Sequence, residues 1–318
     1  MILSYQYFVD VFNQKLFEDS YSDLLKKIAQ NPERYIGLFR PTKPKTKLIQ
    51  NITQSHEIRF GDALETIFEE YFRSTGFDVL QKRFVYKNKE LNIDQLIRKD
   101  DKIYLIEQKV RDDHDSTKKV GQFDNFERKY HAISQMYPNC DIIPIMWFID
   151  DSLVKNRNYY LSQMESMGND YLCTPRLFYG EDMFTEIDCF STEIWKEVIC
   201  YLDRWKNTLP DMPEVNFDLN VDDVYNEIKS LEPIVFRKLF TNSDIVNQIF
   251  PIIFPEGKVL RKLLLHFEAH KGPSVYRSIV SYIIDILDKY YIKPKYSLEH
   301  FSGVKYASDA YDEMALLQ

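Results

Sequence analysis

The sequence is poor in glycine. Its 318 residues include nine glycines, and neither GxGxxG nor GxxxxGK[ST] occurs among them. Both patterns depend on glycine because their backbone closely approaches a phosphate group. The GxSxG and HExxH patterns of hydrolases and zinc proteases are missing as well. These absences disfavour nucleotide-driven mechanisms and two common kinds of hydrolytic site.

Cysteines and long apolar runs are also scarce. The four cysteines, Cys140, Cys173, Cys189 and Cys200, show no CxxC spacing, so we expect reduced thiols and a cytoplasmic protein. No segment approaches the roughly 18 uncharged apolar residues of a membrane span. The first residues, "MILSYQYFVDVFNQK", contain neither a basic n-region nor a small-residue cleavage site, and we therefore expect no signal peptide.

The overall composition is that of a soluble globular protein. The chain is 44% hydrophobic and 28% charged, and it is long enough for one large domain or two modest ones. A net charge of −8 argues against a broad nonspecific coat for nucleic acid, although it leaves room for a local basic groove.

Hydrophobic periodicity predicts an α/β core between residues 55 and 150. A helical pattern ending near Gly76 precedes three strand-like runs with short polar connections, which we expect to form an antiparallel meander. A second helix and a buried strand follow, giving the order helix, three strands, helix, strand, and thus a mixed sheet flanked by helices. The predicted strands are residues 82–87, 91–98, 102–110 and 140–150, and the second helix is 121–137.

Helical patterns dominate on both sides of this core. Two short helices are predicted within residues 5–30, and most of the chain after Asp150 has helical periodicity. The polar stretch 210–223 contains two prolines and is the best linker candidate. We therefore expect an N-terminal helical segment with a basic arm at 1–54, a core at 55–209, and a helical C-terminal region at 210–318.

A basic stretch precedes the core. Residues 39–51 contain Arg40, Lys43, Lys45 and Lys47, two prolines and no acidic residue. An exposed loop and an arm that contacts phosphates are both compatible with this pattern.

Three charged residues lie in apolar strand patterns, where charge is costly unless it is paired or binds a metal. Glu107 and Lys109 are two apart and therefore point to the same face of their strand. Asp94 lies one short turn earlier, so it can be a cross-strand neighbour of Glu107. We expect the three side chains to meet at one end of two paired strands.

This combination suits phosphodiester hydrolysis. Carboxylates of Asp94 and Glu107 are ligands for Mg²⁺, which prefers oxygen, and the backbone carbonyl of Gln108 is a further candidate ligand. A metal ion lowers the pKa of bound water and stabilises negative charge on the phosphate. Lys109 can orient or deprotonate the attacking water, or neutralise the charged intermediate.

The pattern Ile93-Asp94 … Glu107-Gln108-Lys109, in a predicted α-β-β-β-α-β order, resembles the PD-(D/E)XK nuclease superfamily. Isoleucine stands where the family name has proline. The resemblance covers about residues 55–150. It implies a restriction-endonuclease-like fold and Mg²⁺ dependence, with Glu65, in "GDALE", as a supporting carboxylate and Gln122 as a polar residue opening the helix after Lys109.

Within this superfamily the chain looks most like a type II restriction endonuclease. The polar loop "QKVRDDHDSTKKVGQ" follows the proposed catalytic strand, and the segments "DDSLVKNRNYY" and "RLFYGEDMF" resemble those after the core of several such enzymes. The resemblance implies sequence-specific cleavage of double-stranded DNA by a homodimer, with a DNA methyltransferase as functional partner. The predicted DNA contacts are Arg40, Lys43, Lys45, Ser116, Thr117, Lys118, Lys119 and Gln122.

Two other functions stay open. One is another PD-(D/E)XK enzyme, such as a repair or junction-resolving nuclease. The other is a non-catalytic DNA-binding protein with a nuclease fold, although the intact Asp94, Glu107 and Lys109 argue against it.

Two clusters with metal-ligand residue types are expected to be structural. The run from Asp112 to Asp115 includes His114, but adjacent residues rarely converge on one ion, so a solvated loop is expected. His266 and His270 have a spacing that can hold zinc, yet no third ligand is near them in the sequence.

Overall fold

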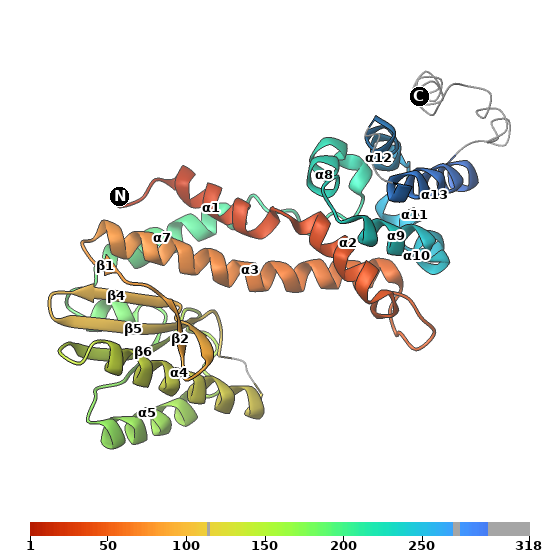
Figure 1. Ribbon diagram of the computed structural model, residues 1–318. Coiled ribbons are helices and arrows are strands. Elements are labelled where there is room, and N and C mark those ends of the chain that lie inside the picture. The colour runs from red at the N-terminus through yellow and green to blue at the C-terminus, as the bar shows by residue number, and fades with distance from the viewer. Residues whose placement is uncertain (113–114, 270–273, 292–318) are drawn as a thin grey trace. The chain divides into compact units, whose positions relative to one another are not determined.

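The computed structural model describes residues 1–112, 115–269 and 274–291, and the chain divides into two compact units (Figure 1). The sheet unit comprises Met1–Leu16 and Ile58–Leu209. The helical unit comprises Phe17–Glu57 and Pro210–Gln318, of which the described part is helical. No helix among the described residues is long and apolar enough to cross a membrane.

A mixed five-stranded sheet forms the centre of the sheet unit. Its order is β1-β4-β5-β6-β7. Strands β1 and β5 both run antiparallel to β4, whereas β5, β6 and β7 are mutually parallel. The predicted α/β fold with a mixed sheet is confirmed. The strands are β1 (Asp78–Val79), β4 (Gln95–Lys99), β5 (Lys102–Lys109), β6 (Asp141–Phe148) and β7 (Arg176–Tyr179).

The predicted three-stranded meander is wrong in its first two strands. Strands β2 (Arg83–Tyr86) and β3 (Lys89–Asn92) form a separate hairpin, and β4 starts only after a break at Ile93-Asp94. Lys87 and Asn88 turn the hairpin with φ angles of 48° and 61°, as a type I′ turn requires. The backbone N–H of Ile93 bonds to the carbonyl of Lys82 instead of to the main sheet. The break leaves Asp94 at the entrance of β4.

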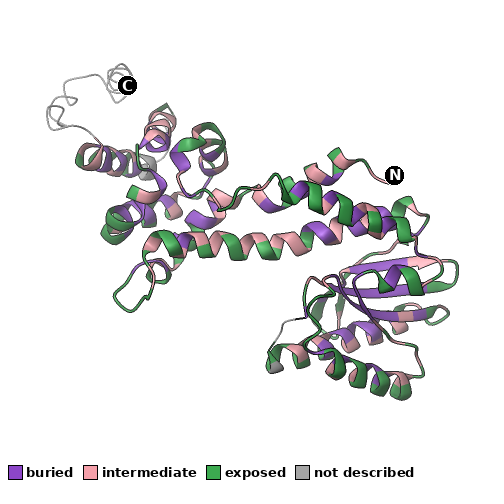
Figure 2. Ribbon diagram, turned by 180° about the vertical axis from the view of Figure 1, so that it is seen from behind, coloured by how far each residue is buried: buried purple, intermediate pink, exposed green. Residues whose placement is uncertain are grey.

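Helices cover both faces of the sheet. Helices α4 (Ser116–Met136) and α5 (Arg157–Tyr171) pack on the face that carries Leu105 and Met146, in one hydrophobic cluster. On the opposite face, Trp147 of β6 contacts Phe68 of α3 at a ring-centroid distance of 4.7 Å. Helices α6 (Asp182–Glu186) and α7 (Thr192–Lys206) join that face through Phe184 and Trp195. Figure 2 shows the strands as largely buried between these helices.

Helix α3 (Pro44–Ser74) is longer than predicted, because it begins inside the basic stretch. The loop prediction for residues 39–51 is therefore wrong from Pro44 onward, and Lys45 and Lys47 are helical. Proline is compatible with a first helical position, since it has no N–H to leave unpaired. The helix ends as predicted: Gly76 has a φ of 87°, and Phe77 N–H bonds to the carbonyl of Phe72.

Two further segments differ from the sequence-based expectation. Strand β7 completes the sheet in a region where mostly helical structure was predicted. Its four residues are too few to show a clear alternation. The predicted linker at 210–223 is partly core: Val215 and Phe217 are buried. Asp218, also buried, accepts hydrogen bonds from the backbone N–H groups of Glu256 and Val259 at 2.8 Å.

Amphipathic helices build most of the remaining described residues, as their periodicity predicts. The two predicted N-terminal helices are α1 (Tyr5–Phe17) and α2 (Ser20–Gln30). The later elements pack Leu and Ile side chains into the core of the helical unit. The other elements of that unit are η1 (Pro32–Arg34), η2 (Phe217–Leu219), α8 (Val221–Ile228), α9 (Pro233–Thr241), α10 (Ser243–Gln248), α11 (Phe250–Ile253), α12 (Lys258–Ala269) and α13 (Ser274–Tyr290).

Candidate active site

The register of β4 and β5 brings the predicted residues together. Gln95 pairs with Ile106, so Asp94, one residue earlier, lies beside the end of β5 that carries Glu107. Glu107 and Lys109 alternate with Gln108 and point to the α4 side of the sheet. Asp94 is held there because its Oδ2 accepts the backbone N–H of Gln108 at 2.9 Å.

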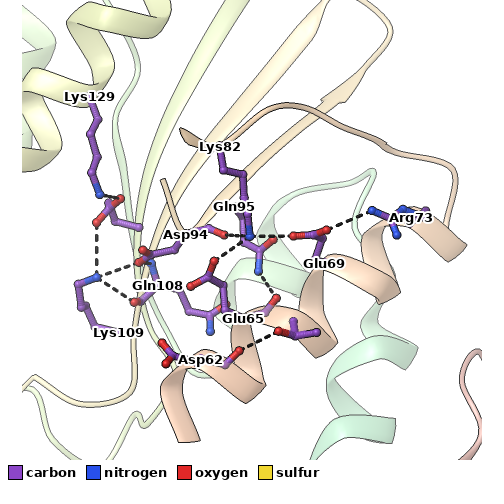
Figure 3. A network of polar contacts seen from close by, with 12 residues as sticks. Asp62, Glu65, Glu69, Arg73, Lys82, Asp94, Gln95, Gln108, Lys109 and Lys129 are labelled. Carbon is purple, nitrogen blue, oxygen red and sulfur yellow. Dashed lines mark hydrogen bonds and ion pairs between the residues drawn. The ribbon is translucent and has the colours of Figure 1, made fainter. Parts of the chain in front are cut away.

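Three oxygen atoms converge on the ammonium group of Lys109 (Figure 3). Its Nζ lies 2.8 Å from Asp94 Oδ2, 3.4 Å from Glu107 Oε2 and 3.1 Å from the backbone carbonyl of Gln108. These are the three groups predicted as metal ligands. At the end of β5 these three oxygens therefore surround one cation, the ammonium group of Lys109.

A second lysine, which sequence reasoning missed, reaches the same carboxylate. Lys129 of α4 pairs with Glu107 Oε1, and both side chains are almost completely buried, at 5% and 6% exposure. A signal was present in the sequence, because Lys129 lies three residues after Phe126 and four before Ile133, on the buried face of α4. A lysine at such a position needs a buried partner.

Burial and neighbouring charge shift the ionisation of this cluster. Burial raises the pKa of Glu107 above its usual range and Asp94 adds to the shift, while Lys109 and Lys129 oppose it. For Lys109, burial acts to lower the pKa, but the carboxylates of Glu107 and Asp94 outweigh it and hold the pKa above its usual value. Lys109 is therefore protonated while these contacts last.

A ladder of ion pairs supports the backbone of Asp94. Lys82 Nζ donates to the carbonyl oxygen of Asp94 at 3.0 Å and pairs with Glu65 and Glu69 of α3, each at 2.7 Å. The row of ion pairs continues to Arg73, which pairs with Glu69 at 3.1 Å (Figure 3). Glu65 is thus linked to the site through Lys82, a residue that no pattern in the sequence identifies.

The buried amide of Gln95 ties the same helix to β4. Its Nε2 donates to the carbonyl of Glu65 at 2.6 Å. Burial raises the pKa of Glu65, although the Lys82 contact opposes that rise. The neighbourhood of Asp94 is therefore fixed from both the sheet and α3.

The expectation that Asp112 lies in a solvated loop is wrong. Asp112 is fully buried and accepts hydrogen bonds from Asn156 N and Nδ2, each at 2.8 Å, and from Tyr179 Oη at 2.9 Å. Its partners carry no charge, so it anchors the segment after β5. Asp115 caps α4 through the N–H groups of Thr117 and Lys118. Asp113 and His114 lie outside the described residues.

The predicted polar loop after β5 is shorter than expected, because α4 begins at Ser116. Thr117, Lys118 and Lys119 occupy its first turn, where backbone N–H groups favour anions. Lys119 Nζ lies 4.6 Å from the ring centroid of Tyr159. The side chain of Ser116 lies outside the described part.

The prediction that Gln122 opens this helix is wrong. Gln122 lies inside α4, and its Oε1 accepts a hydrogen bond from the buried Tyr160 Oη at 2.9 Å.

Arg40, Lys43 and Lys45 are exposed and belong to the helical unit, whereas the cluster around Glu107 belongs to the sheet unit. Leu38 and Phe39, which precede Arg40, are almost fully exposed, at 92% and 97%. In the zinc candidate, His266 Nδ1 lies 3.0 Å from Tyr225 Oη, whereas His270 lies outside the described residues.

The donor set of the site consists of oxygen atoms. Within residues 1–112, 115–269 and 274–291, no group of three or more His, Cys, Asp or Glu side chains is arranged to hold a metal ion. Two carboxylates with a carbonyl oxygen are a different kind of set, which suits Mg²⁺ because this ion keeps several water ligands.

A family of known proteins resembles the segment that contains most of these residues. A family model described as "Type II restriction endonuclease, HinfI" matches residues 80–206. The matched segment contains Asp94, Glu107, Lys109 and Lys129 and begins after Glu65. The comparison with curated proteins gives no match. The predicted resemblance to type II restriction endonucleases is thereby confirmed for this segment.

Proposed function

We propose that the protein is a type II restriction endonuclease that hydrolyses phosphodiester bonds of double-stranded DNA at a specific sequence, with Mg²⁺ as cofactor. The observation that carries the proposal is the convergence of Asp94 Oδ2, Glu107 Oε2 and the Gln108 carbonyl on one cationic nitrogen. The family match over residues 80–206 supports the same class of enzyme.

Asp94, Glu107 and the carbonyl of Gln108 are the proposed ligands of Mg²⁺. When bound, such an ion activates a water molecule and stabilises charge on the scissile phosphate. Lys109 contacts all three groups and is the only one of the proposed set that carries a positive charge. Its role is to orient the attacking water and to stabilise the charge of the phosphate in the transition state.

A change in the contacts of Lys109 would alter that role. Its carboxylate partners hold its pKa high, so as long as they contact it, it acts as a fixed cation. If another cation bound these carboxylates, burial would become the main influence on Lys109. Burial lowers the pKa of a lysine, and a lysine with a lowered pKa can deprotonate water. Glu65 is proposed to support the site through Lys82, which bonds to Asp94.

The proposed DNA contacts divide between two elements. Thr117, Lys118 and Lys119 begin α4, with Ser116 before them and Gln122 one turn further. Hydroxyl and basic side chains at this position are suited to phosphate contacts. Arg40, Lys43 and Lys45 form the second set, in a stretch without acidic residues.

The remaining parts of the proposal concern organisation. Residues 55–209 serve as the nuclease core, and 210–318 contribute dimer or DNA contacts. A two-fold homodimer places one active site on each strand of a palindromic sequence. The protein acts in the cytoplasm beside a DNA methyltransferase that protects the host genome.

The test is digestion of unmethylated bacteriophage DNA by the purified protein with Mg²⁺. The set includes Asp94→Ala, Lys109→Ala, an EDTA control and the surface variant Lys196→Ala. Discrete fragments from wild type and Lys196→Ala, lost in the other samples, are expected. A smear would instead indicate a repair or junction-resolving nuclease. No cleavage on several DNAs that sample all short recognition sequences would indicate a non-catalytic DNA-binding protein.

A further inference from the structure

We propose that Lys129 is a positioning residue that acts as a built-in counterion of Glu107 and thereby weakens the binding of divalent metal to the DNA-free protein. The proposal rests on the proposed function, because it describes how the same site takes up its metal. It assigns no substrate contact to Lys129, which acts through Glu107.

The first support is the way in which the two oxygens of Glu107 are used. Oε1 pairs with Lys129, and Oε2 lies 3.4 Å from Lys109. Both oxygens of the buried carboxylate therefore already have a cationic partner. A metal ion that takes Glu107 as a ligand has to compete with at least one of these lysines.

The second support is the difference between the lysines. The Lys109 side chain is 28% exposed and contacts three oxygens at the open end of β5. The Lys129 side chain is 5% exposed and comes from α4. A long side chain at the edge of a site can move aside, whereas Lys129 has no solvent to move into without leaving a buried charge unpaired. Lys129 thus stays when Lys109 moves.

The third support is the charge of the cluster. Asp94 and Glu107 contribute two negative charges, and Lys109 and Lys129 contribute two positive ones, so the four groups are neutral together. A divalent ion adds two positive charges to a mostly buried site. The charge of Lys129 therefore opposes the binding of a divalent ion to the DNA-free protein.

A purely structural role for Lys129 makes the opposite prediction. If Lys129 only held the fold together, its removal would disturb the ligands and weaken metal binding. If Lys129 is a counterion, its removal leaves the cluster with one net negative charge at any pH where Glu107 stays ionised. It also frees Glu107 Oε1, so metal binding to the DNA-free protein strengthens. The sign of the change separates the two roles.

The test is a titration of DNA-free protein with Mn²⁺, followed by electron paramagnetic resonance, for wild type, Lys129→Gln and Lys129→Arg. The surface variant Lys196→Gln removes the same charge from an exposed position and is the control. We expect Lys129→Gln to bind Mn²⁺ at least about tenfold more tightly than wild type. Lys129→Arg and Lys196→Gln should match wild type. Equal or weaker binding by a folded Lys129→Gln would overturn the proposal.

A second measurement covers the case in which Lys129→Gln does not fold. Lys129→Met keeps a side chain of similar length without its charge, and it is titrated with Mn²⁺ in the same way. It should also bind Mn²⁺ at least about tenfold more tightly than wild type. Equal or weaker binding by a folded Lys129→Met would overturn the proposal. If wild type cuts no DNA, the proposed function fails, while the titration of the DNA-free variants still decides the role of Lys129.

Discussion

Two buried carboxylates, Glu107 and Asp112, lie five residues apart at the end of β5 and just after it, and the structure treats them differently. Asp112 is satisfied by a backbone N–H, an amide and a phenol. Glu107 is paired with two lysines. Neutral donors fix a carboxylate in place, whereas cations leave it a charge that another cation can take over. Burial alone therefore does not distinguish an active carboxylate from an anchoring one; the charge of its partners does.

The largest expected effect is on cleavage by Glu107→Gln. The variant keeps the size of the side chain but removes the negative charge that the proposed metal and both lysines need. We expect cleavage to fall by about 10²–10⁴-fold, measured as the rate of cutting of a mapped site. A variant that cuts as fast as wild type would show that Glu107 has no part in catalysis.

The matched change at the other carboxylate, Asp112→Ala, should act on stability. It leaves Tyr179 Oη and two donors of Asn156 without their shared acceptor. We expect a loss of about 2–4 kcal/mol in the free energy of unfolding, measured by urea denaturation. At temperatures where the variant is folded, it should cut DNA. If the variant were as stable as wild type but did not cleave DNA, Asp112 would have a role in cleavage and not in anchoring the chain.

A smaller effect is expected for Lys82→Met, which removes the link between α3 and the backbone of Asp94. Lys82 touches no proposed metal ligand side chain, only the carbonyl of Asp94 and two glutamates. We expect about a tenfold fall in the cleavage rate, since small misplacement of a ligand is costly. Lys82→Arg should retain more of the rate because it keeps the charge. An unchanged rate in Lys82→Met would show that Glu65 does not support cleavage through Lys82.

The smallest effects are expected from single changes in the basic stretch. Lys43→Ala and Lys45→Ala should each weaken DNA binding uniformly across sequences and reduce the slope of log affinity against log salt by about 1. Fluorescence anisotropy at several salt concentrations measures that slope. An unchanged slope in both variants would show that these lysines face solvent and do not contact DNA, which is the other interpretation of the basic stretch.

The sequence allowed the sheet and the central cluster to be predicted because both follow from local pattern. Alternation placed Glu107 and Lys109 on one face, and a short connection brought Asp94 beside them. The break at Ile93-Asp94 could not be predicted, since the apolar residues of 91–98 are interrupted by neither glycine nor proline. Lys82 depends on the separate hairpin and on α3, which no local spacing encodes. Lys129 could be recognised only as a charged residue on a buried helix face. It lies outside the pattern of Asp94, Glu107 and Lys109, so the family resemblance does not point to it.

The contacts of the active cluster are close in sequence, and this has a consequence for synthesis on the ribosome. Lys109 and Asp94 are 15 residues apart, and Lys129 and Glu107 are 22 apart. In the helical unit, by contrast, Ser22 bonds to Glu227 across 205 residues. Nearby segments close sooner, because less chain entropy is lost. During translation the ion pairs around Glu107 can therefore form while residues 210–318 are still being made, before the contacts of the helical unit can close.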